Sequence, residues 1–530
     1  MALVLIGFMG AGKSSRARRL AHMRGARAID SDALLIERFG HSVAREFDLH
    51  GEAAFRAAEE EVVCPVLERA GPREVIALGG GSVLSRRIRD ALSGHLVALL
   101  DVDVDVAWER VHDRDDGSER PLARDRDAFG ALHAERRALY EDLADGWLLW
   151  AESDSGEYPV FIGEGLILED VDDPDPRGRL AAMWPLDTAA SRPYLVTDTT
   201  VGGLYGSRLT DVLGAGEGSR EDDSAAERGT PTRSLEIEPG ETHKTLATAE
   251  RLWRELVRGG ATRADHLVAL GGGVVGDLAG FCAATYQRGI PIVHVPTTLV
   301  AEVDSAYGGK TGVDLPEAKN YIGAYHQPAG VLVDPLALAS LPAPELAAGW
   351  VEVLKTALIA GGELWERVSS MSGCLPDAAT VRDCAATKLA IVREDERDSG
   401  RRQVLNLGHT VGHAIETVTG YSRYRHGEAV GLGLLAALRL SGAEDLRERV
   451  RELLIARELP VHLDSGANAG VSKEPGRVDV DRIVAATTRD KKRLGAGSVP
   501  FVLVSAPGRV EIGQRVSASD LRAAVAELIA

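Results

Sequence analysis

Two short stretches of the chain place a lysine directly after a glycine, a pattern that can hold phosphate groups: GFMGAGKSS at 7–15 and AYGGKTG at 306–312. The first follows an apolar run and fits the spacing GxxxxGKS, with its motif residues at Gly7, Gly12, Lys13 and Ser14. Glycines let backbone N–H groups turn towards phosphate oxygens, the lysine reaches the terminal phosphates, and the serine hydroxyl can hold Mg²⁺. We therefore expect a nucleotide-binding loop here, rather than a glycine turn that binds nothing.

The second stretch lacks the glycine cradle of a nucleotide loop. The residue six positions before Lys310 is Asp304, where such a loop needs glycine, and the preceding VPTTLVAEVDSAY is typical of a strand followed by irregular chain. A lysine on a tight glycine turn can still bind an anion. Taken alone, the motif is equally compatible with a solvent-exposed lysine.

Histidines with metal-ligand spacing form a third candidate site. The segment LNLGHTVGHAIE places His409 and His413 on one face of a helix, and His426 follows in RHGE. Two imidazoles at this spacing can share a divalent metal, but the glutamate of an HExxH metalloprotease is missing. Helical Glu352 in WVEVLK could complete a nitrogen and oxygen ligand set suited to Zn²⁺ or Co²⁺. For His413 alone, a packing role is as compatible as a ligand role.

Composition limits the kinds of protein this can be. A chain of 530 residues is too long for one core, and its net charge of −19 argues against broad binding to nucleic acid or anionic membranes. The four scattered cysteines favour a reducing cytosol, and no apolar run approaches the length of a membrane helix. The apolar start of the chain is typical of a first strand rather than a signal peptide. We expect a soluble, cytoplasmic protein.

The elements that must position these residues follow an α/β pattern and then a helical one. Short apolar strands at 3–6, 75–78 and 96–100 alternate with helical stretches, and a second such series has strands at 193–198, 266–273 and 291–298. After about residue 340 strands almost vanish, and helices are expected at 344–360, 384–396 and 427–442. The charged or polar segments at 115–128 and 214–234 predict surface loops.

Further residues narrow the first site. Asp30 and Asp32 are expected at a strand end, facing the same side, so that one could serve the metal and the other a substrate hydroxyl. GEAAFR supplies Arg56, LGGGS supplies adjacent glycines, and SERPLA supplies Arg120. With the phosphate loop, this set resembles shikimate kinase across nearly all of the first 145 residues.

The resemblance implies roles for this part of the chain. ATP and Mg²⁺ would be bound by Gly10, Ala11, Gly12, Lys13, Ser14, Ser15, Asp30 and Arg120. Shikimate would be bound by Asp32, Arg56, Gly80 and Arg136. Asp32 would orient or deprotonate the attacking hydroxyl, and Arg120 would close over the transferring phosphate as a lid arginine.

Two departures from that family stand out. Ala138 replaces the proline of the family's RxPLY segment in RRALY. The family also continues with a strand and a terminal helix, whereas here LADGWLLW, at 143–150, leads almost directly into the next domain. The last element of the kinase is therefore either supplied by the neighbouring domain or absent, which bears on kinase efficiency rather than on substrate identity.

The rest of the chain carries an ordered series of motifs: PGETHK, LGGGVVGDLAGF, ATYQRG, VPTTL, VDSAYGGKTGVD, KNYIGAYHQP, LAAGWVEVLK, LNLGHTVGHAIE, RHGEAVGLG and RDKK. This series resembles 3-dehydroquinate synthase over about residues 150–530. The resemblance implies a P-loop kinase domain at 1–146, with a parallel sheet between helices on both faces. It further implies an α/β NAD-binding half at 147–340 and an α-helical half, binding metal and substrate, at 341–530.

The same resemblance assigns the ligands of the second enzyme. Zn²⁺ or Co²⁺ would be held by Glu352, His409 and His426. NAD would be bound by Asp198, Glu241, Lys244, Gly273, Val274, Asp277, Thr297, Thr298, Asp304, Ser340 and Glu345. The acidic, phosphorylated sugar acid would be bound by Arg288, Lys310, Lys319, Asn320, Lys355, Lys388, Arg402, Asn406, His413 and Lys492.

The implied protein is a bifunctional enzyme of aromatic amino acid biosynthesis, through the shikimate and chorismate pathway. One part would phosphorylate shikimate at its 3-hydroxyl with ATP. The other would convert 3-deoxy-D-arabino-heptulosonate 7-phosphate to 3-dehydroquinate, releasing phosphate and regenerating NAD within each turnover. The catalytic side chains would be Lys13, Asp32, Arg120, Lys310, Lys355, Lys388, Arg402 and His413. The family suggests a homodimer through the synthase region.

Alternatives remain open at this point. The first domain could be a regulatory or weakly active kinase, and the rest could be a metal-dependent polyol dehydrogenase or a relative that makes another carbocycle. The two implied reactions are not consecutive, so the fusion does not imply channelling. Asp314, Tyr307 and His326 replace residues that are commoner in the synthase family, and a carboxylate near Lys310 could weaken anion binding unless it pairs locally.

Overall fold

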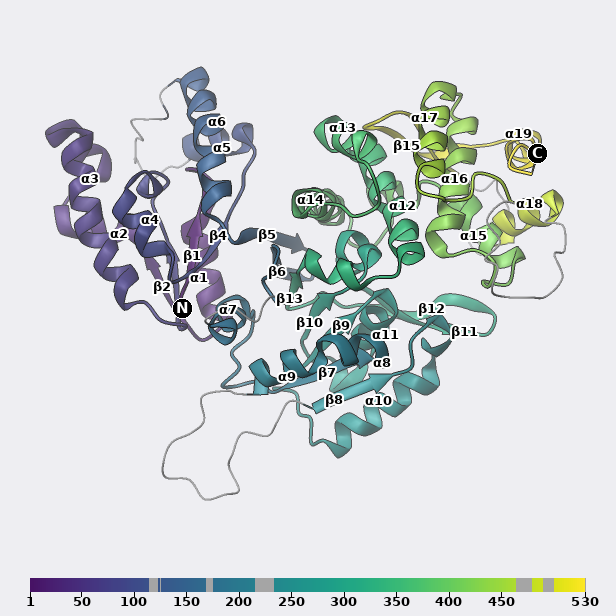
Figure 1. The fold of residues 1–530 in the computed structure, drawn as a ribbon, viewed down its shortest axis with the longest axis horizontal. Coiled ribbons are helices and arrows are strands. Elements are labelled where there is room, and N and C mark those ends of the chain that lie inside the picture. The colour runs from purple at the N-terminus through teal and green to yellow at the C-terminus, as the bar shows by residue number, and fades with distance from the viewer. Residues whose placement is uncertain are drawn as a thin grey trace. The chain divides into compact units, whose positions relative to one another are not determined.

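The structure, a computed structural model, describes residues 1–113, 123, 125–167, 175–214, 233–463, 479–489 and 500–529. The described chain folds into two compact units (Figure 1). Unit 1 consists of Met1–Ala151, Glu157–Pro296 and Gly309–Leu336. Unit 2 consists of Glu152–Gly156, Thr297–Gly308 and Ala337–Ala530.

The first part of unit 1 is a parallel sheet between helices. Its strands are β1 (Leu3–Ile6), β2 (Arg27–Asp30), β3 (Glu74–Ala77) and β4 (Leu96–Leu99), and β1 pairs in parallel with β3 and β4. Its helices are α1 (Lys13–Met23), α2 (Ser31–Phe39), α3 (Val43–Arg69), α4 (Arg86–Leu92), α5 (Val104–His112) and α6 (Arg126–Leu143). Alternate residues of β1 enter two different cores, one shared with α1 and one with α3, so helices cover both faces.

The second part of unit 1 repeats this architecture. Its strands are β6 (Gly156–Ile162), β7 (Pro193–Asp198), β8 (Arg233–Ile237), β9 (His266–Gly271), β10 (Ile292–Pro296) and β13 (Gly330–Val333). Its helices are α7 (Pro176–Met183), α8 (Thr199–Val201), α9 (Ser207–Gly214), α10 (Leu246–Arg258) and α11 (Gly273–Thr285). A separate antiparallel hairpin consists of β11 (Lys310–Leu315) and β12 (Ala318–Tyr325). Strands β7, β9 and β10 are almost wholly buried, as expected of a parallel sheet covered on both faces.

One strand joins the two parts of unit 1. Strand β5 (Gly146–Ser153) pairs in parallel with β4, and after a short turn the chain enters β6, which pairs with β13. Among the described residues the result is an 11-stranded sheet in the order β2-β3-β1-β4-β5-β6-β13-β10-β9-β7-β8. The backbones of the two strands come close together at Gly146 and Gly163. A Cβ at Gly146 would lie 2.5 Å from the carbonyl oxygen of Ile162, and a Cβ at Gly163 would lie 2.5 Å from that of Asp145.

Unit 2 is largely helical. It contains α12 (Ala343–Ala360), α13 (Gly362–Ser370), α14 (Ala378–Glu394), α15 (His409–Val418), α16 (His426–Leu440), α17 (Glu444–Ile455), α18 (Val480–Arg489) and α19 (Ala518–Ala526). Helices α12 and α16 are buried along most of their length, so α16 is a central helix against which α12, α15, α17 and α19 pack. The predicted order of an α/β kinase part, an α/β half and a helical half is confirmed.

After residue 340 strands almost vanish, as predicted: among the described residues there, β14 (Pro500–Ala506) and β15 (Arg509–Arg515) form one antiparallel hairpin. Two local predictions were wrong. The stretch after VPTT is not irregular, since Ala301–Ser305 is a turn of π-helix. Asp30 and Asp32 do not share a strand face: Asp30 ends β2 and caps α2, its carboxylate accepting the N–H of Asp32 in the first helical turn.

The structure reports less on other parts of the sequence. No helix among the described residues is long and apolar enough to cross a membrane. Most of the predicted loops at 115–128 and 214–234 lies outside the described residues.

We expect Gly433 of α16 to be required for stability. A Cβ at Gly433 would lie 1.9 Å from the carbonyl oxygen of Gly408, the residue that caps α15 directly before His409. Gly433→Ala should therefore lower the free energy of unfolding by about 1–3 kcal/mol, measured by urea denaturation. Gly431→Ala is the matched control, because its Cβ would meet only the flexible side chain of Leu454, at 3.3 Å. Equal costs for the two variants would contradict the close-approach argument.

Candidate active sites

The phosphate loop lies between β1 and the start of α1. Gly10 and Gly12 have φ values of 82° and 88°, which favour glycine, and a Cβ at Gly10 would lie 2.7 Å from a carbonyl oxygen of α5. The ammonium of Lys13 donates to the carbonyl oxygens of Gly7 and Phe8 at 2.8 and 3.0 Å, so it folds over the loop. The loop therefore has the backbone that a phosphate cradle needs.

The predicted shikimate residues converge on the glycine run after β3. The Arg136 guanidinium and the Tyr140 hydroxyl both donate to the carbonyl oxygen of Gly80, Arg136 at 3.5 Å. Arg56 lies against Gly81, where a Cβ would be 2.2 Å from its guanidinium. A Cβ at Gly79 would lie 2.6 Å from the carboxylate of Asp32. Elements far apart in sequence thus bring one carboxylate and two guanidinium groups around a side-chain-free loop.

Sequence reasoning missed two residues of this region. Glu59 is buried, accepts a hydrogen bond from Arg56 at 2.6 Å and one from Ser82 at 2.6 Å, and so fixes the arginine. Arg110, near the end of α5, donates to Gly10 of the phosphate loop at 3.3 Å. The spacing of Arg56 and Glu59, three residues apart on a helix, was the available signal for the first. The predicted lid arginine, Arg120, lies outside the described residues.

The predicted NAD residues of unit 1 surround the start of α11. Gly273 and Val274 form its first turn, and Gly271 has a φ of 159°. Buried Lys244 lies 2.6 Å from the carboxylate of Asp277, and Glu241 is 3.8 Å away. Asp198 caps α8 by accepting N–H groups from Thr200 and Val201. The N–H groups at a helix start attract anions, which suits a dinucleotide pyrophosphate.

Two residues predicted for the sugar-acid substrate lie beside this group. Lys244 donates to the side-chain oxygen of Asn320 at 2.5 Å, and Lys319 is 3.6 Å from Glu241. Asp314, the departure that could weaken anion binding, accepts the backbone N–H of Asn320 at 2.7 Å, so its carboxylate pairs locally. Burial raises the pKa of the Asp314 carboxyl above its ordinary value.

The remaining predicted NAD residues belong to unit 2. The side-chain oxygen of Thr298 accepts the backbone N–H of Ala301, and Thr297 is buried. Ser340 ends a 3₁₀ turn, and Glu345 accepts a hydrogen bond from Arg425 at 2.7 Å. Asp304, the last residue of this set, forms ion pairs with Lys355 and Lys388.

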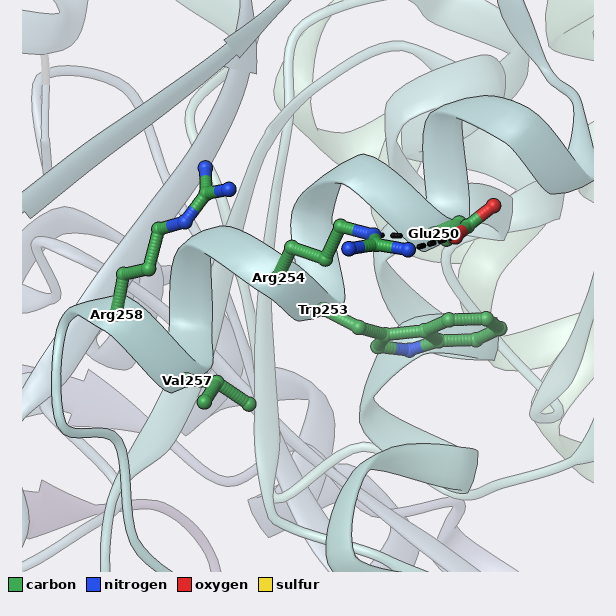
Figure 2. Close-up of a pocket in the computed structure, with 5 residues that line it drawn as sticks. All are labelled: Glu250, Trp253, Arg254, Val257 and Arg258. Atoms are coloured by element: carbon green, nitrogen blue, oxygen red, sulfur yellow. Dashed lines mark hydrogen bonds and ion pairs between the residues drawn. The ribbon is translucent and has the colours of Figure 1, made fainter.

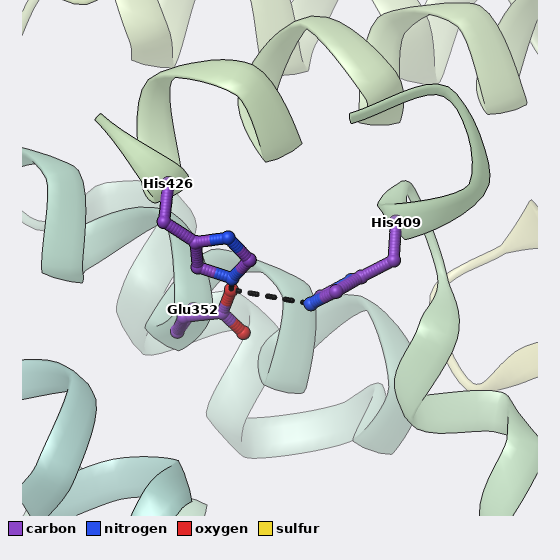
Figure 3. A group of neighbouring side chains, drawn as sticks. All are labelled: Glu352, His409 and His426. Atoms are coloured by element: carbon purple, nitrogen blue, oxygen red, sulfur yellow. Dashed lines mark ion pairs between the residues drawn. The ribbon is translucent and has the colours of Figure 1, made fainter. Parts of the chain in front are cut away.

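The metal-ligand candidates come together from three helices of unit 2 (Figure 3). The Nε2 atoms of His409 and His426 lie 3.7 and 3.5 Å from Oε1 of Glu352, and Figure 3 shows both rings beside that carboxylate. Donor atoms of the three residues all lie within 4.8 Å of one another. Glu352 is fully buried, yet its Oε1 accepts no well-formed hydrogen bond from the described residues. An oriented carboxylate with two imidazoles is a fitting donor set for Zn²⁺ or Co²⁺.

Electrostatics at this group favour a cation. Burial opposes ionisation of Glu352, but Lys355 and the two histidines hold the pKa of its carboxyl well below the usual range. Burial and the Lys355 ammonium lower the pKa of His409 to about 3, so its imidazole is neutral, as a metal ligand must be. Burial disfavours charge on His426 too, yet Glu352 and Glu416 raise its pKa to about 10. Positive charge is therefore stabilised at the point where the three side chains meet.

Glu416 is a site residue that sequence reasoning missed. Its Oε2 lies 3.4 Å from Nδ1 of His426, on the side of the ring opposite Glu352, and the residue is 4 % exposed. Metal-bound histidines commonly donate their second ring N–H to a carboxylate, which fixes ring orientation. The signal was present in the sequence, because Glu416 is seven residues after His409, on the same helix face.

A lysine pair adjoins the metal candidates. Lys355 lies 2.5 Å from Oε2 of Glu352 and 3.3 Å from Oδ2 of Asp304, and Lys388 contacts the other oxygen of Asp304. Burial lowers the pKa of Lys388 to about 8. The positive charges of Arg402 and Lys355 lower it further, and together these effects outweigh the attraction of Asp304. The arrangement holds two buried cations against one half-buried anion, Asp304.

The other predicted anion-binding residues have varied surroundings. Buried Arg402 donates to the carbonyl oxygens of Gly308 and Glu396 at 3.1 and 2.6 Å, so it holds backbone near GGKTG. Gly308 and Gly309 both have positive φ, which makes the turn before Lys310 tight, as predicted. His413 lies on α15 with its ring centroid 5.2 Å from that of His409.

Three more residues predicted to bind the sugar-acid substrate are Asn406, Arg288 and Lys492. Asn406 ends the 3₁₀ turn ahead of His409. Arg288, whose φ is 71°, is exposed after α11. Lys492 lies outside the described residues.

A surface pocket lies apart from all of these residues. It measures about 450 Å³ and is lined by Glu250, Trp253, Arg254, Val257 and Arg258, all on α10 (Figure 2). Arg254 is paired with Glu250 on the same helix at 2.6 Å. None of the five is a predicted site residue, so the pocket is not evidence for either reaction.

Comparison with known proteins gives three family matches. Residues 9–157 match Shikimate kinase, residues 234–348 match 3-dehydroquinate synthase N-terminal, and residues 349–493 match 3-dehydroquinate synthase C-terminal. The 3-dehydroquinate synthase of Gloeobacter violaceus is 41 % identical over 343 residues, covering 63 % of this chain and 88 % of that protein. That of Geobacter metallireducens is 45 % identical over 282 residues, covering 51 % and 74 %.

Solved structures show the same fold. A 2-deoxy-scyllo-inosose synthase with carbaglucose-6-phosphate, NAD⁺ and Co²⁺ aligns with a TM-score of 0.58 at 23 % identity, over 72 % of this chain and 100 % of that one. A 2-epi-5-epi-valiolone synthase from Streptomyces hygroscopicus with NAD⁺ and Zn²⁺ aligns at 0.54 and 25 %, over 70 % and 96 %. The family matches and the curated relatives establish that this chain belongs to the 3-dehydroquinate synthase family, with a shikimate kinase domain at residues 9–157, and that it has both activities in the shikimate pathway.

Proposed function

We propose that residues 1–146 transfer phosphate from ATP to the 3-hydroxyl of shikimate. We propose that 147–340 and 341–530 are the two halves of an enzyme that converts 3-deoxy-D-arabino-heptulosonate 7-phosphate to 3-dehydroquinate. One observation carries the second assignment: Glu352, His409 and His426 meet beside two buried lysines. A phosphorylated sugar acid with hydroxyl groups needs both a metal ion and a cationic subsite.

In the kinase, the chain's own residues would act by position and charge. The Lys13 ammonium would leave the carbonyl oxygens of Gly7 and Phe8 and, together with the loop N–H groups, bind the phosphates of ATP, with Mg²⁺ at Ser14. Arg56 and Arg136 would pair with the substrate carboxylate, since guanidinium groups suit carboxylates. Asp32, beside Gly79, would accept the proton of the attacking hydroxyl.

In the synthase, Glu352, His409 and His426 would hold Zn²⁺ or Co²⁺, and Gly273, Val274 and their predicted partners would bind NAD. When bound, NAD would take and return a hydride and the metal ion would polarise substrate hydroxyl oxygens. Lys355 and Lys388 would pair with the acidic groups of the substrate, exchanging part of their contact with Asp304. His413 would contact the phosphate group that leaves.

The assembly and compartment are further parts of the proposal. Both enzyme families act on small molecules, and we propose a homodimer through the synthase region. Cys64, Cys282 and Cys384 are free and buried, and Cys374 is free as well, which supports a reducing cytoplasm. Measuring the mass of the purified protein by light scattering tests the dimer.

Lys13→Ala should lower shikimate-dependent ADP release about 100-fold or more, because it removes a charge that stabilises the transferring phosphate. Synthase activity, followed as phosphate release, should be unchanged in the same preparation. Unchanged kinase turnover in this variant would contradict the proposal that this domain is a kinase and would favour a regulatory role for it.

Glu352→Gln should abolish tight Zn²⁺ or Co²⁺ binding, measured by competition with a chromophoric chelator, and with it phosphate release. Glu416→Gln should weaken binding about tenfold, because a neutral amide orients His426 less firmly. Glu428→Gln is the control: this carboxylate is also buried on α16 but contacts Arg425 rather than an imidazole. Loss of metal in the Glu416 variant alone would place the ion on His413, Glu416 and His426 instead.

The KM of the synthase for heptulosonate phosphate should rise with pH above about 8. The pKa of Lys388 is lowered to about 8, so the ammonium is present below that pH and is lost above it, together with its attraction for an anion. Lys388→Arg should keep its charge and show no such rise between pH 7 and 9 in steady-state kinetics. An identical rise in both proteins would assign the effect to another group.

A further inference from the structure

The core beside the phosphate-binding helix is built from both enzymes. One face of the kinase sheet and α1 contribute Leu3, Leu5, Ala17 and Leu20 to a hydrophobic cluster. The same cluster contains Leu166, Leu180, Met183 and Trp184. These four lie beyond residue 157, where the match to shikimate kinase ends. The synthase half therefore covers a face of the kinase that would otherwise be exposed to water.

Polar contacts tie the end of α1 to this covering segment. Arg24, which caps α1, donates from one nitrogen to the carbonyl oxygen of Ala181 on α7 at 2.8 Å and to that of Pro72 at 3.1 Å. Arg24 is buried, so these carbonyls replace water around its charge. Helix α7 is thus joined to the end of α1 by one hydrogen bond as well as by apolar contact.

A single carboxylate binds the first two turns of α1. Glu157, on β6, lies 3.1 Å from Arg16 and 2.8 Å from Arg19, and it accepts the indole N–H of Trp150 at 2.6 Å. The guanidinium of Arg16 stacks over the Trp150 ring, 4.6 Å from its centroid. Glu157 therefore joins β6, the strand in which the match to shikimate kinase ends, to the helix whose first residues are Lys13, Ser14 and Ser15.

These contacts differ from ordinary surface ion pairs. An isolated exposed pair contributes little to stability, and Arg38 with Glu61 is such a pair in the same domain. Glu157 is 29 % exposed, has contacts with three donors on two elements, and pairs with Arg16, which directly follows the loop residue Ser15. A shift of α1 would move the backbone N–H groups of the loop away from the phosphate oxygens, on which their hydrogen bonds depend.

We propose that residues 157–167 and 175–184 are a functional part of the kinase, with Glu157 as a positioning residue for the phosphate-binding helix. This inference rests on the proposed kinase function. It answers the question raised by the missing terminal element: the neighbouring half supplies the cover. Because phosphate binding contributes equally before and during transfer, loss of Glu157 affects the KM for ATP more than kcat.

The test uses the full-length protein and Glu157→Gln. The Kd for ADP with Mg²⁺, measured by calorimetry, should rise about three- to tenfold. The KM for ATP should rise in parallel, while kcat, the KM for shikimate and phosphate release by the synthase stay unchanged. Glu61→Gln, the matched control, should bind ADP like the unmodified protein. Equal ADP affinity in both variants would overturn the positioning role.

A second pair of variants tests the cover itself. Leu180→Ala, on α7, should weaken ADP binding, because it opens a cavity in the cluster that contacts α1. Leu256→Ala is the matched control, a buried leucine of α10 in a different cluster, and should lower the unfolding temperature without changing ADP affinity. Equal effects of the two on ADP affinity would overturn the inference. If the unmodified protein bound no ADP, the proposed kinase function itself would fail.

Discussion

Backbone hydrogen bonds between β5 and β6 join the parallel sheet of the kinase part to the parallel sheet that follows it. Without this pairing, the two sheets would be separate. Strand β5 completes the kinase order β2-β3-β1-β4-β5, and β6 begins the order that continues through β13 and β10. The connection between them is a short turn, so the two strands run antiparallel and the rotation of one sheet relative to the other is fixed by their pairing. The shared apolar cluster and the contacts of Glu157 depend on that register.

Unit 2 depends on a different constraint, the compensation of buried charge. Glu352 and Asp304 are carboxylates in a site shielded from water, and each can ionise there only beside cations. Lys355 contacts both, Lys388 contacts Asp304, and His426 lies between Glu352 and Glu416. In the proposed synthase, a site so arranged would exchange one set of ion pairs for another when an anionic substrate and a metal ion bind, which would limit the desolvation cost of binding.

Motifs with a fixed local geometry were predictable from the sequence. The phosphate loop and the glycine turn before Lys310 follow from spacing, and the strands at 3–6 and 193–198 were placed to the residue. The group of Glu352, His409 and His426 was implied by the family resemblance, whereas spacing alone pointed to His409 and His413. Asp30 and Asp32 were misplaced because a capping carboxylate starts a helix where alternation alone predicts more strand. The role of Glu157 was not predictable, because it depends on partners brought close only by the fold. Glu416 shares a helix face with His409, so the sequence held a signal for it, although its contact with His426 depends on the fold.

The pairing of β5 with β6 also removes an exposed edge strand from each sheet. Without β6, the outer side of β5 would offer a row of unpaired N–H and C=O groups, and without β5 the same would hold for β6. Such strands readily pair with another chain, so natural sheets protect them with charges, prolines or bulges. Here each strand protects the other. Dividing the chain between Ser153 and Gly156 would therefore create two adhesive surfaces at once, and the separated halves would be prone to aggregate before either could be assayed.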